Sequence, residues 1–173
     1  MGRNSKCLTR RRSRYHPDDH PPSQRHSPID VAEMLRYQLT HPQILAALAA
    51  GGHGAKVLVS DGHYPHSTGA AWRATVVHLN FAPDRPLVTE VLEVLLDAVA
   101  VEAATVMSPP ENVATPPIFE EFRSLLPDDV PLTRLDRFTF YDAARANDVI
   151  LLIATGDRRT YANIMVTLGV SPH

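Results

Sequence analysis

The sequence contains one cysteine, Cys7, among 173 residues. A lone thiol cannot form an intrachain disulfide and does not support a cysteine-based zinc site, so the composition fits a reducing cytoplasm. The sequence also lacks any apolar run near the roughly 18 residues that a membrane-spanning helix requires. The first thirty residues lack the apolar core of a secretory signal. Since 44% of the residues are hydrophobic, we expect a soluble globular chain of one domain with an appendage.

Charge is distributed unevenly along the chain. Residues 1–30 hold seven Lys or Arg against three Asp, a net charge of +4, and residues 31–173 hold ten basic and sixteen acidic residues, a net charge of −6. An acidic body disfavours nucleic acid as the main partner. The early segment has few aliphatic residues to offset its ordering entropy, so we predict a disordered basic extension over residues 1–33.

The Arg-rich part of that extension, LTRRRSR, suits an electrostatic contact with nucleic acid or anionic lipid, but we favour a dispensable extension. Met34 opens a segment that would make a complete domain by itself. The predicted α/β domain is therefore residues 34–173, and translation from Met34 is a hypothesis.

Helical and β-rich patterns alternate from Thr40 onward. Thr40 and Gln43 match a capping box, and Gly51 and Gly52 end that first helix by supplying a left-handed residue. The continuous β-former run at 56–60 is typical of a central strand covered on both faces. Further β-rich runs lie at 72–81, 99–107, 148–156 and 161–169, and helices are predicted at 86–98, 116–126 and 137–147, the last capped by Asp136. This alternation predicts a three-layer α/β sandwich with a mostly parallel sheet and helices on both faces.

Two residues flanking the strand at 56–60 are the first candidates for a site. His53 lies between Gly52 and Gly54, beside open backbone, and an imidazole is the usual general acid or base near neutral pH. Asp61 follows the strand, where ligands of open α/β sheets bind. The plainer interpretations are a histidine filling a turn and a turn-forming Asp before Gly62.

The same region offers a metal alternative. Imidazole and carboxylate groups are common metal ligands, and His53, Asp61, His63 and His66 lie close in sequence. Their spacing matches no established ligand pattern, so metal binding is the minor hypothesis, and no metal or other cofactor is predicted.

Later candidates are Arg137 and residues 161–163. Arg137 starts a helix, where a cation opposes the dipole, so either an oxygen-rich ligand or a pairing with Asp136 or Asp142 accounts for it. Tyr161, Ala162 and Asn163 follow a turn and suit either sugar hydroxyls or turn hydrogen bonds. Tyr141 is expected to be a core residue.

Four motifs occur in order along residues 35–170: GHG at 52–54, SDGHYPHS at 60–67, RFTFYDAARA at 137–146 and TGDRRTYANIMVTLGV at 155–170. Together they resemble the ribose pyranase and fucose mutarotase family. The motifs of the fucose mutarotase branch are the more similar to GHG, DGHYP and RFTFY. The segment VEAA at 101–104 is similar to the corresponding segment of the ribose branch.

The resemblance implies a cofactor-free isomerase that interconverts sugar anomers or ring forms, and the lone cysteine agrees with a place in the cytoplasm. By motif match, His53 would be the acid/base residue, and the sugar would be bound by Asp61, Arg137, Tyr161, Ala162 and Asn163. Such proteins form homo-oligomeric rings, typically decamers, whose sites a neighbouring subunit completes.

The chain departs from the family in having Ala55 where an Asp is common. If that carboxylate tunes the histidine, activity here is weaker or the substrate differs. The first hypothesis is a mutarotase acting on L-fucose or a similar monosaccharide. A non-catalytic monosaccharide-binding protein is the second, and a metal-dependent enzyme is the third.

Overall fold

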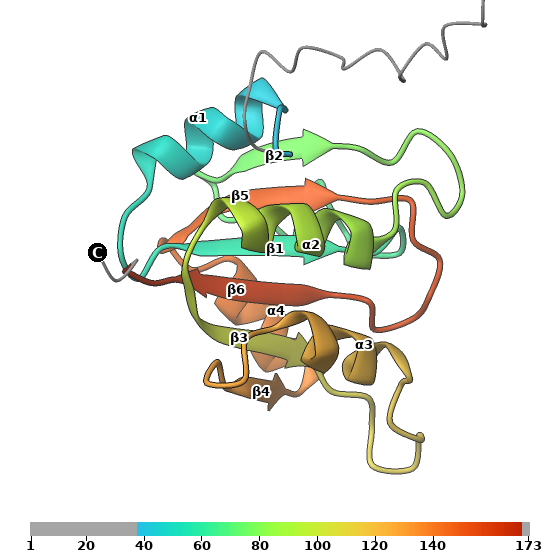
Figure 1. Ribbon diagram of the computed structural model, residues 1–173. Coiled ribbons are helices and arrows are strands. Elements are labelled where there is room, and N and C mark those ends of the chain that lie inside the picture. The colour runs from blue at the N-terminus through green and yellow to red at the C-terminus, as the bar shows by residue number, and fades with distance from the viewer. Residues whose placement is uncertain (1–37, 171–173) are drawn as a thin grey trace, which may run out of the picture. The chain divides into compact units, whose positions relative to one another are not determined.

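The computed structural model describes residues 38–170 (Figure 1). The predictions made for residues 1–33 and for a start at Met34 lie outside this range. Four helices and six strands occur in the order α1 (Pro42–Ala50), β1 (Lys56–Ser60), β2 (Thr75–His78), α2 (Val88–Ala98), β3 (Val101–Met107), α3 (Ile118–Leu125), β4 (Leu132–Leu135), α4 (Arg137–Ala144), β5 (Val149–Ala154) and β6 (Ile164–Leu168). Within residues 38–170 no helix combines the length and apolarity that crossing a membrane requires.

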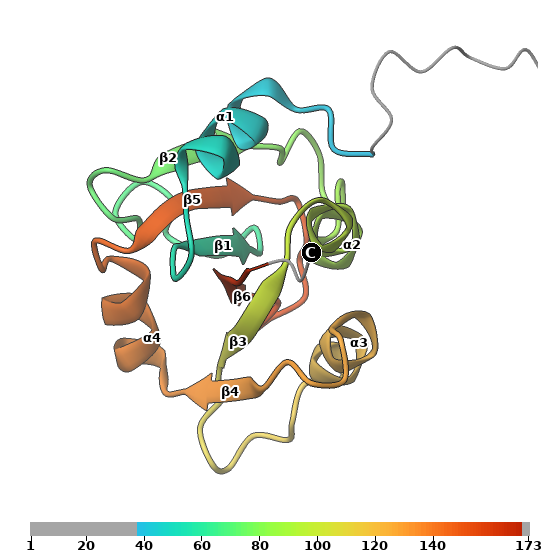
Figure 2. The ribbon, with the colours of Figure 1, turned by 60° about the vertical axis from the view of Figure 1, so that its left-hand side comes forward.

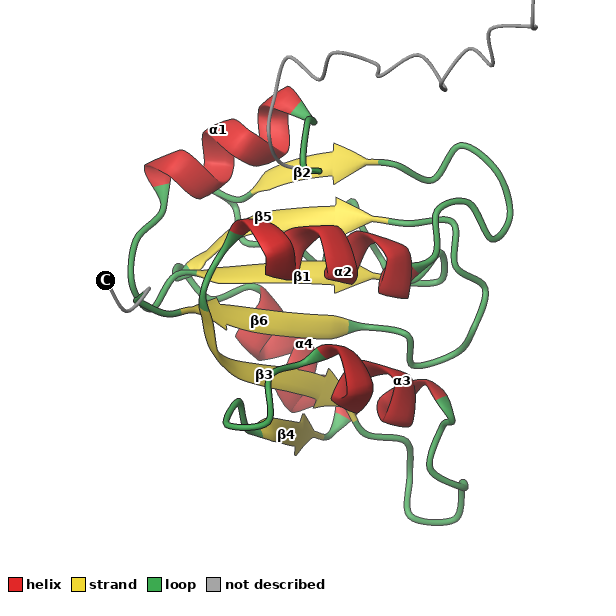
Figure 3. Cartoon of the chain, viewed as in Figure 1, coloured by secondary structure: helices red, strands yellow, loops and turns green. Residues whose placement is uncertain are grey.

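The six strands form one sheet in the order β2-β5-β1-β6-β3-β4. Strands β2, β5 and β1 pair in parallel, as do β3 and β4, whereas β6 is antiparallel to both of its neighbours (Figure 3). The mostly parallel sheet predicted from the alternation of elements is confirmed. Strand β1 lies inside the sheet and is buried over Val57–Ser60, as its unbroken run of β-formers predicted.

Helices cover both faces of this sheet (Figure 2). One hydrophobic cluster joins Ile44 of α1, Leu92 of α2 and Phe122 of α3 to one face. The other cluster joins Phe140 and Ala144 of α4 to Leu58 on the opposite face. Alternate residues of β1 enter different clusters, because side chains point to opposite faces along a strand. The three-layer α/β sandwich is therefore confirmed.

The ends of α1 differ from the prediction. The capping box is wrong: the N-cap is His41, it makes no side-chain capping bond, and Pro42 is the first helical residue. Proline is tolerated there because its missing N–H would be unpaired anyway. Gly51 ends the helix in extended backbone, and the left-handed residue is Gly54, with φ of 81°. A Cβ at Gly51 would lie 2.5 Å from Ile150 Cδ1, so the tip of the Ile150 side chain would have to move to admit it.

The cap of α4 is as predicted. The Asp136 carboxylate accepts hydrogen bonds from the N–H groups of Phe138 and Thr139. This cap fixes the start of α4 beside the end of β4, and so places Arg137 at the edge of the sheet where β1 and β3 end.

Candidate functional site

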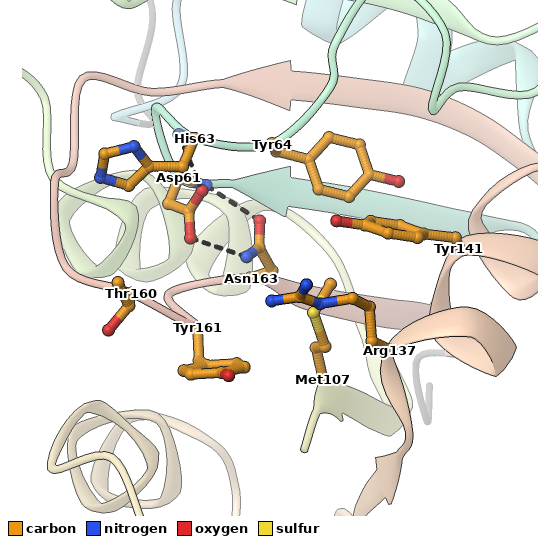
Figure 4. Close-up of a pocket in the computed structure, with 9 residues that line it drawn as sticks. All are labelled: Asp61, His63, Tyr64, Met107, Arg137, Tyr141, Thr160, Tyr161 and Asn163. Carbon is orange, nitrogen blue, oxygen red and sulfur yellow. Dashed lines mark hydrogen bonds between the residues drawn. The ribbon is translucent and has the colours of Figure 1, made fainter. Parts of the chain in front are cut away.

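A cavity of about 290 Å³ lies beyond the carboxyl end of β1. Its walls come from the segment after β1, from the end of β3, from α4 and from the segment before β6 (Figure 4). The side chains that line it are those of Asp61, His63, Tyr64, Met107, Arg137, Tyr141, Thr160, Tyr161 and Asn163. This is the edge of the sheet at which Asp61 was predicted to face a ligand.

Asp61 and Asn163 form a reciprocal pair at the floor of the cavity. Asn163 Nδ2 donates to Asp61 Oδ2 at 2.7 Å, and the Asp61 backbone N–H donates to Asn163 Oδ1 at 3.1 Å. The second carboxylate oxygen accepts the His63 N–H at 3.0 Å. Both side chains are almost fully buried, with 2% and 4% of their surface exposed. The two residues are 102 positions apart, and the pairing of β1 with β6 brings them together.

Burial raises the pKa of Asp61 above its usual value. The hydrogen bonds from the His63 N–H and from Asn163 act in the opposite direction and do not cancel the effect of burial. A buried carboxyl group with a raised pKa at the end of a strand is a candidate for ligand binding or proton transfer.

Tyr161 forms one wall in an uncommon backbone conformation, with φ of 65°. A non-glycine residue in this region is strained and is held only where its surroundings impose it. The preceding segment is anchored by Arg159, whose guanidinium binds the buried Asp157 at 2.7 Å and Glu121 of α3 at 2.7 Å. Asp157 also accepts the Val88 N–H at the start of α2, at 3.1 Å. The wall is thus tied to two helices.

Arg137 enters the cavity from the start of α4 (Figure 4). The predicted alternative, a pairing with Asp136 or Asp142, is absent from the described part of the chain: Asp136 caps the helix, and Asp142 lies 3.9 Å from Arg145. No hydrogen bond or ion pair joins the Arg137 guanidinium to another residue between 38 and 170. Its five donors face the cavity and suit an oxygen-rich ligand.

Two tyrosines complete the wall on this side. Tyr141 was expected in the core, and this is wrong in part: it lines the cavity while its ring packs edge-on against Tyr64 with centroids 5.7 Å apart. The Tyr64 hydroxyl donates to the Gly69 carbonyl at 2.7 Å, and burial raises its pKa. Tyr64 is therefore a structural wall and not an acid or base.

His53 lies at the other end of β1 from this cavity. The five residues of the strand span about 16 Å at 3.3 Å per residue, beyond the reach of an imidazole. Its Nε2 instead lies 2.8 Å from Glu102 Oε2, on the exposed surface. Four of the six residues proposed from sequence line one cavity, namely Asp61, Arg137, Tyr161 and Asn163. Ala162 is fully buried next to them in the chain. His53 does not line the cavity.

The four residues of the metal alternative do not gather. Within residues 38–170, no three His, Cys, Asp or Glu side chains are grouped closely enough to ligate an ion. His66 instead contacts the buried Ser60 Oγ at 3.1 Å, and burial lowers its pKa. His63 lies at the cavity with Nε2 at 3.2 Å from the Arg158 carbonyl.

Sequence reasoning missed four of the lining residues, namely Tyr64, Met107, Tyr141 and Thr160. Met107 is the last residue of β3, so the rule that located Asp61 at the end of its strand would also have found it. Thr160 precedes Tyr161 directly. Tyr64 lies in the loop after β1 and Tyr141 in α4, and both fall within the motifs quoted above, but an aromatic ring is equally typical of a core residue.

A model of the RbsD / FucU transport protein family matches residues 34–171. The chain belongs to the RbsD/FucU family.

Three solved structures share its fold. RbsD of Bacillus subtilis, solved with D-ribose, is 20% identical, has a TM-score of 0.68, and aligns over 80% of this chain and 100% of its own. The fucose mutarotase of Streptococcus pneumoniae, solved with L-fucose, is 22% identical with a TM-score of 0.65, over 76% and 94% of the two chains. FucU of Bifidobacterium longum is 24% identical with a TM-score of 0.66, over 77% and 97%.

Both branches of the RbsD/FucU family thus share this fold to a similar degree. Membership of the family, predicted from four motifs, is confirmed.

Proposed function

We propose that this protein is a monosaccharide mutarotase that interconverts anomers or ring forms of L-fucose or a similar sugar. The observation that carries the proposal is the cavity in which the Asp61–Asn163 pair, the unpaired Arg137 and the strained Tyr161 converge. A volume of about 290 Å³ lies at the small end of ligand pockets, which are roughly 300–1,000 Å³. Two solved structures of similar fold, one with D-ribose and one with L-fucose, support a sugar of this size.

Mutarotation suits a site of hydrogen-bonding and proton-transfer groups. The ring oxygen gains a proton as its bond to the anomeric carbon breaks, and the anomeric hydroxyl loses a proton as the carbonyl forms. Rotation and reversal of these steps give the other anomer. Positioned general acids and bases typically accelerate such proton transfers by about 10²–10⁴-fold. We assign sugar binding to Asp61, Arg137, Tyr161, Ala162 and Asn163, where Ala162 contributes backbone.

His53 is assigned as the acid/base residue, which requires a second copy of the chain. Because His53 lies a full strand length from the cavity of its own chain, it would act in the cavity of a neighbouring copy. This geometry supports a homo-oligomer with shared sites, which we propose to be a decameric ring in the cytoplasm. The exposed position of His53, with 63% of its side-chain surface accessible, suits insertion into a neighbour.

A second candidate is a monosaccharide-binding protein without catalysis. The specific observation that favours it is the distance of His53 from the cavity, because a single chain then offers a sugar site without its proposed proton donor. The two candidates differ only in turnover.

Exchange NMR between the anomers of L-fucose, D-ribose and other monosaccharides distinguishes the candidates. We expect the purified protein to accelerate anomer exchange of at least one sugar over buffer, and His53→Gln to lose that acceleration. Binding without acceleration would favour the second candidate, and neither binding nor acceleration would reject both. A full rate in His53→Gln would reject the role of this residue.

A further inference from the structure

The His53–Glu102 contact lies outside the cavity, and the function proposed above leaves Glu102 without a role. His53 Nε2 and Glu102 Oε2 are 2.8 Å apart, although the residues are 49 positions apart. Isolated surface pairs of this kind contribute little to stability. The energy of the contact alone therefore does not account for the close approach of two exposed side chains.

The end of β6 holds both partners in place. On one side, the Gly54 N–H donates to the Leu168 carbonyl at 2.9 Å, which ties the His53 loop to this strand. On the other side, β3 pairs with β6 through an irregularity between Val101 and Ala103, so Glu102 is the bulged residue. Bulges redirect side chains, and this one turns Glu102 toward the His53 loop.

Gly169 allows the close approach. A Cβ at this position would lie 3.1 Å from Glu102 Cβ and 3.3 Å from Glu102 N, so a larger residue would press directly on Glu102. The Gly169 N–H also donates to the Ala100 carbonyl at 2.9 Å, just before the bulge. The backbone thus brings Glu102 and the His53 loop together at the end of β6, within reach of the contact between the two side chains.

The contact commits one ring nitrogen. A carboxylate accepts hydrogen bonds, so Nε2 carries a proton in this arrangement and Nδ1 is the nitrogen left to face a ligand. A carboxylate that holds an imidazole in this manner fixes the ring orientation as well as the proton position. Ala55 leaves the His53 loop with no carboxylate between the histidine and β1, and Glu102 supplies one from β3.

We propose that Glu102 is the positioning residue for His53: it holds the imidazole by Nε2 and presents Nδ1 to the sugar in the cavity of a neighbouring copy. The proposal rests on the mutarotase function above. Nδ1 is then the ring nitrogen that exchanges the proton, and Glu102, outside the cavity, controls the orientation of the ring.

The chain offers a matched control. Asp148 pairs with Lys56 Nζ at 2.7 Å, at the start of β1 and so at the same end of the sheet as His53. Its carboxylate is 44% exposed, against 42% for Glu102. Asp148→Asn thus removes a carboxylate of similar exposure from another pair nearby. Glu102→Ala removes the acceptor for His53, and Glu102→Gln keeps an amide oxygen there.

The test combines NMR of the His53 ring with steady-state kinetics on the full-length assembly. Protein labelled with ¹³C in the histidine rings reports the order parameter of the His53 ring, and His53→Gln assigns its signal. We expect Glu102→Ala to lower that order parameter and to reduce kcat about tenfold with KM within about twofold. Glu102→Gln should recover part of both changes, and Asp148→Asn should match wild type.

Two results would overturn the proposal. One is an unchanged order parameter for His53 in Glu102→Ala, and the other is an equal loss of kcat in Asp148→Asn. If the wild-type protein accelerates anomer exchange of no sugar, the proposed function fails. The order parameter of the His53 ring still decides whether Glu102 holds His53.

Discussion

Replacement of Asn163 by leucine tests the buried pair at the floor of the cavity. Asn163→Leu keeps the side-chain size but removes the donor to Asp61 Oδ2 and the acceptor for the Asp61 N–H. Each buried polar group left unpaired costs about 1–3 kcal/mol, so losing both bonds should lower the free energy of unfolding by about 2–6 kcal/mol at neutral pH. Urea unfolding at one fixed protein concentration measures this, because an oligomer's stability depends on concentration.

The loss should depend on pH in a direction that follows from Asp61. Its folded pKa is raised by burial, so its contribution favours folding below the unfolded pKa and is lost as pH rises through the folded pKa. Asn163 opposes this by hydrogen bonding to the ionised form. Asn163→Leu should therefore destabilise the fold more at pH 7 than at pH 4, and Asp61→Asn should remove the difference. A loss under about 0.5 kcal/mol, or one independent of pH, would refute the reasoning.

Three further predictions concern the walls of the cavity. Arg137→Ala removes a charged donor without a partner in the described chain, so KM should rise about 10–100-fold with the urea midpoint unchanged; an unchanged KM would exclude Arg137 from binding. Tyr161→Phe keeps the ring and removes only the hydroxyl, so sugar affinity measured by calorimetry should fall about two- to tenfold; equal affinity would remove the hydroxyl from the site. Burial opposes ionisation of Asp157, but hydrogen bonds from Arg159 and the Val88 N–H outweigh it and hold its pKa below the usual value. Its stabilisation is present above the unfolded pKa and lost as pH falls, so Arg159→Gln should cost about 2 kcal/mol at pH 7 and less in acid; an equal cost at both pH values would contradict this.

The local signals in the sequence predicted most of the fold. The unbroken apolar run of β1, the Asp136 cap and the amphipathic helices each depend on neighbouring residues, and each is present as predicted. Strand β4 was missed because its four residues, at the edge of the sheet, have no alternation of buried and exposed positions. The reversed direction of β6 was not predictable from its own residues, because the same apolar pattern suits either direction.

The site was predictable only in part for the same reason. Asp61 follows from its place at the end of a strand, and the motifs that resemble the family add Arg137 and residues 161–163. Contacts between distant segments left no local signal. The Asp61–Asn163 pair depends on the β1–β6 register, and the His53–Glu102 contact depends on a bulge in β3.

The central claim is that sugar turnover requires the Asp61 cavity of one chain and His53 of another. Anomer exchange measured on mixed assemblies of two variants, His53→Gln and Asp61→Asn, tests it most directly. Each variant alone should lose the acceleration, and an equal mixture dissociated and reassembled should recover about one quarter of the wild-type rate, because about one site in four pairs two intact partners. No recovery in assemblies of wild-type size, or a wild-type rate in either variant alone, would contradict the account.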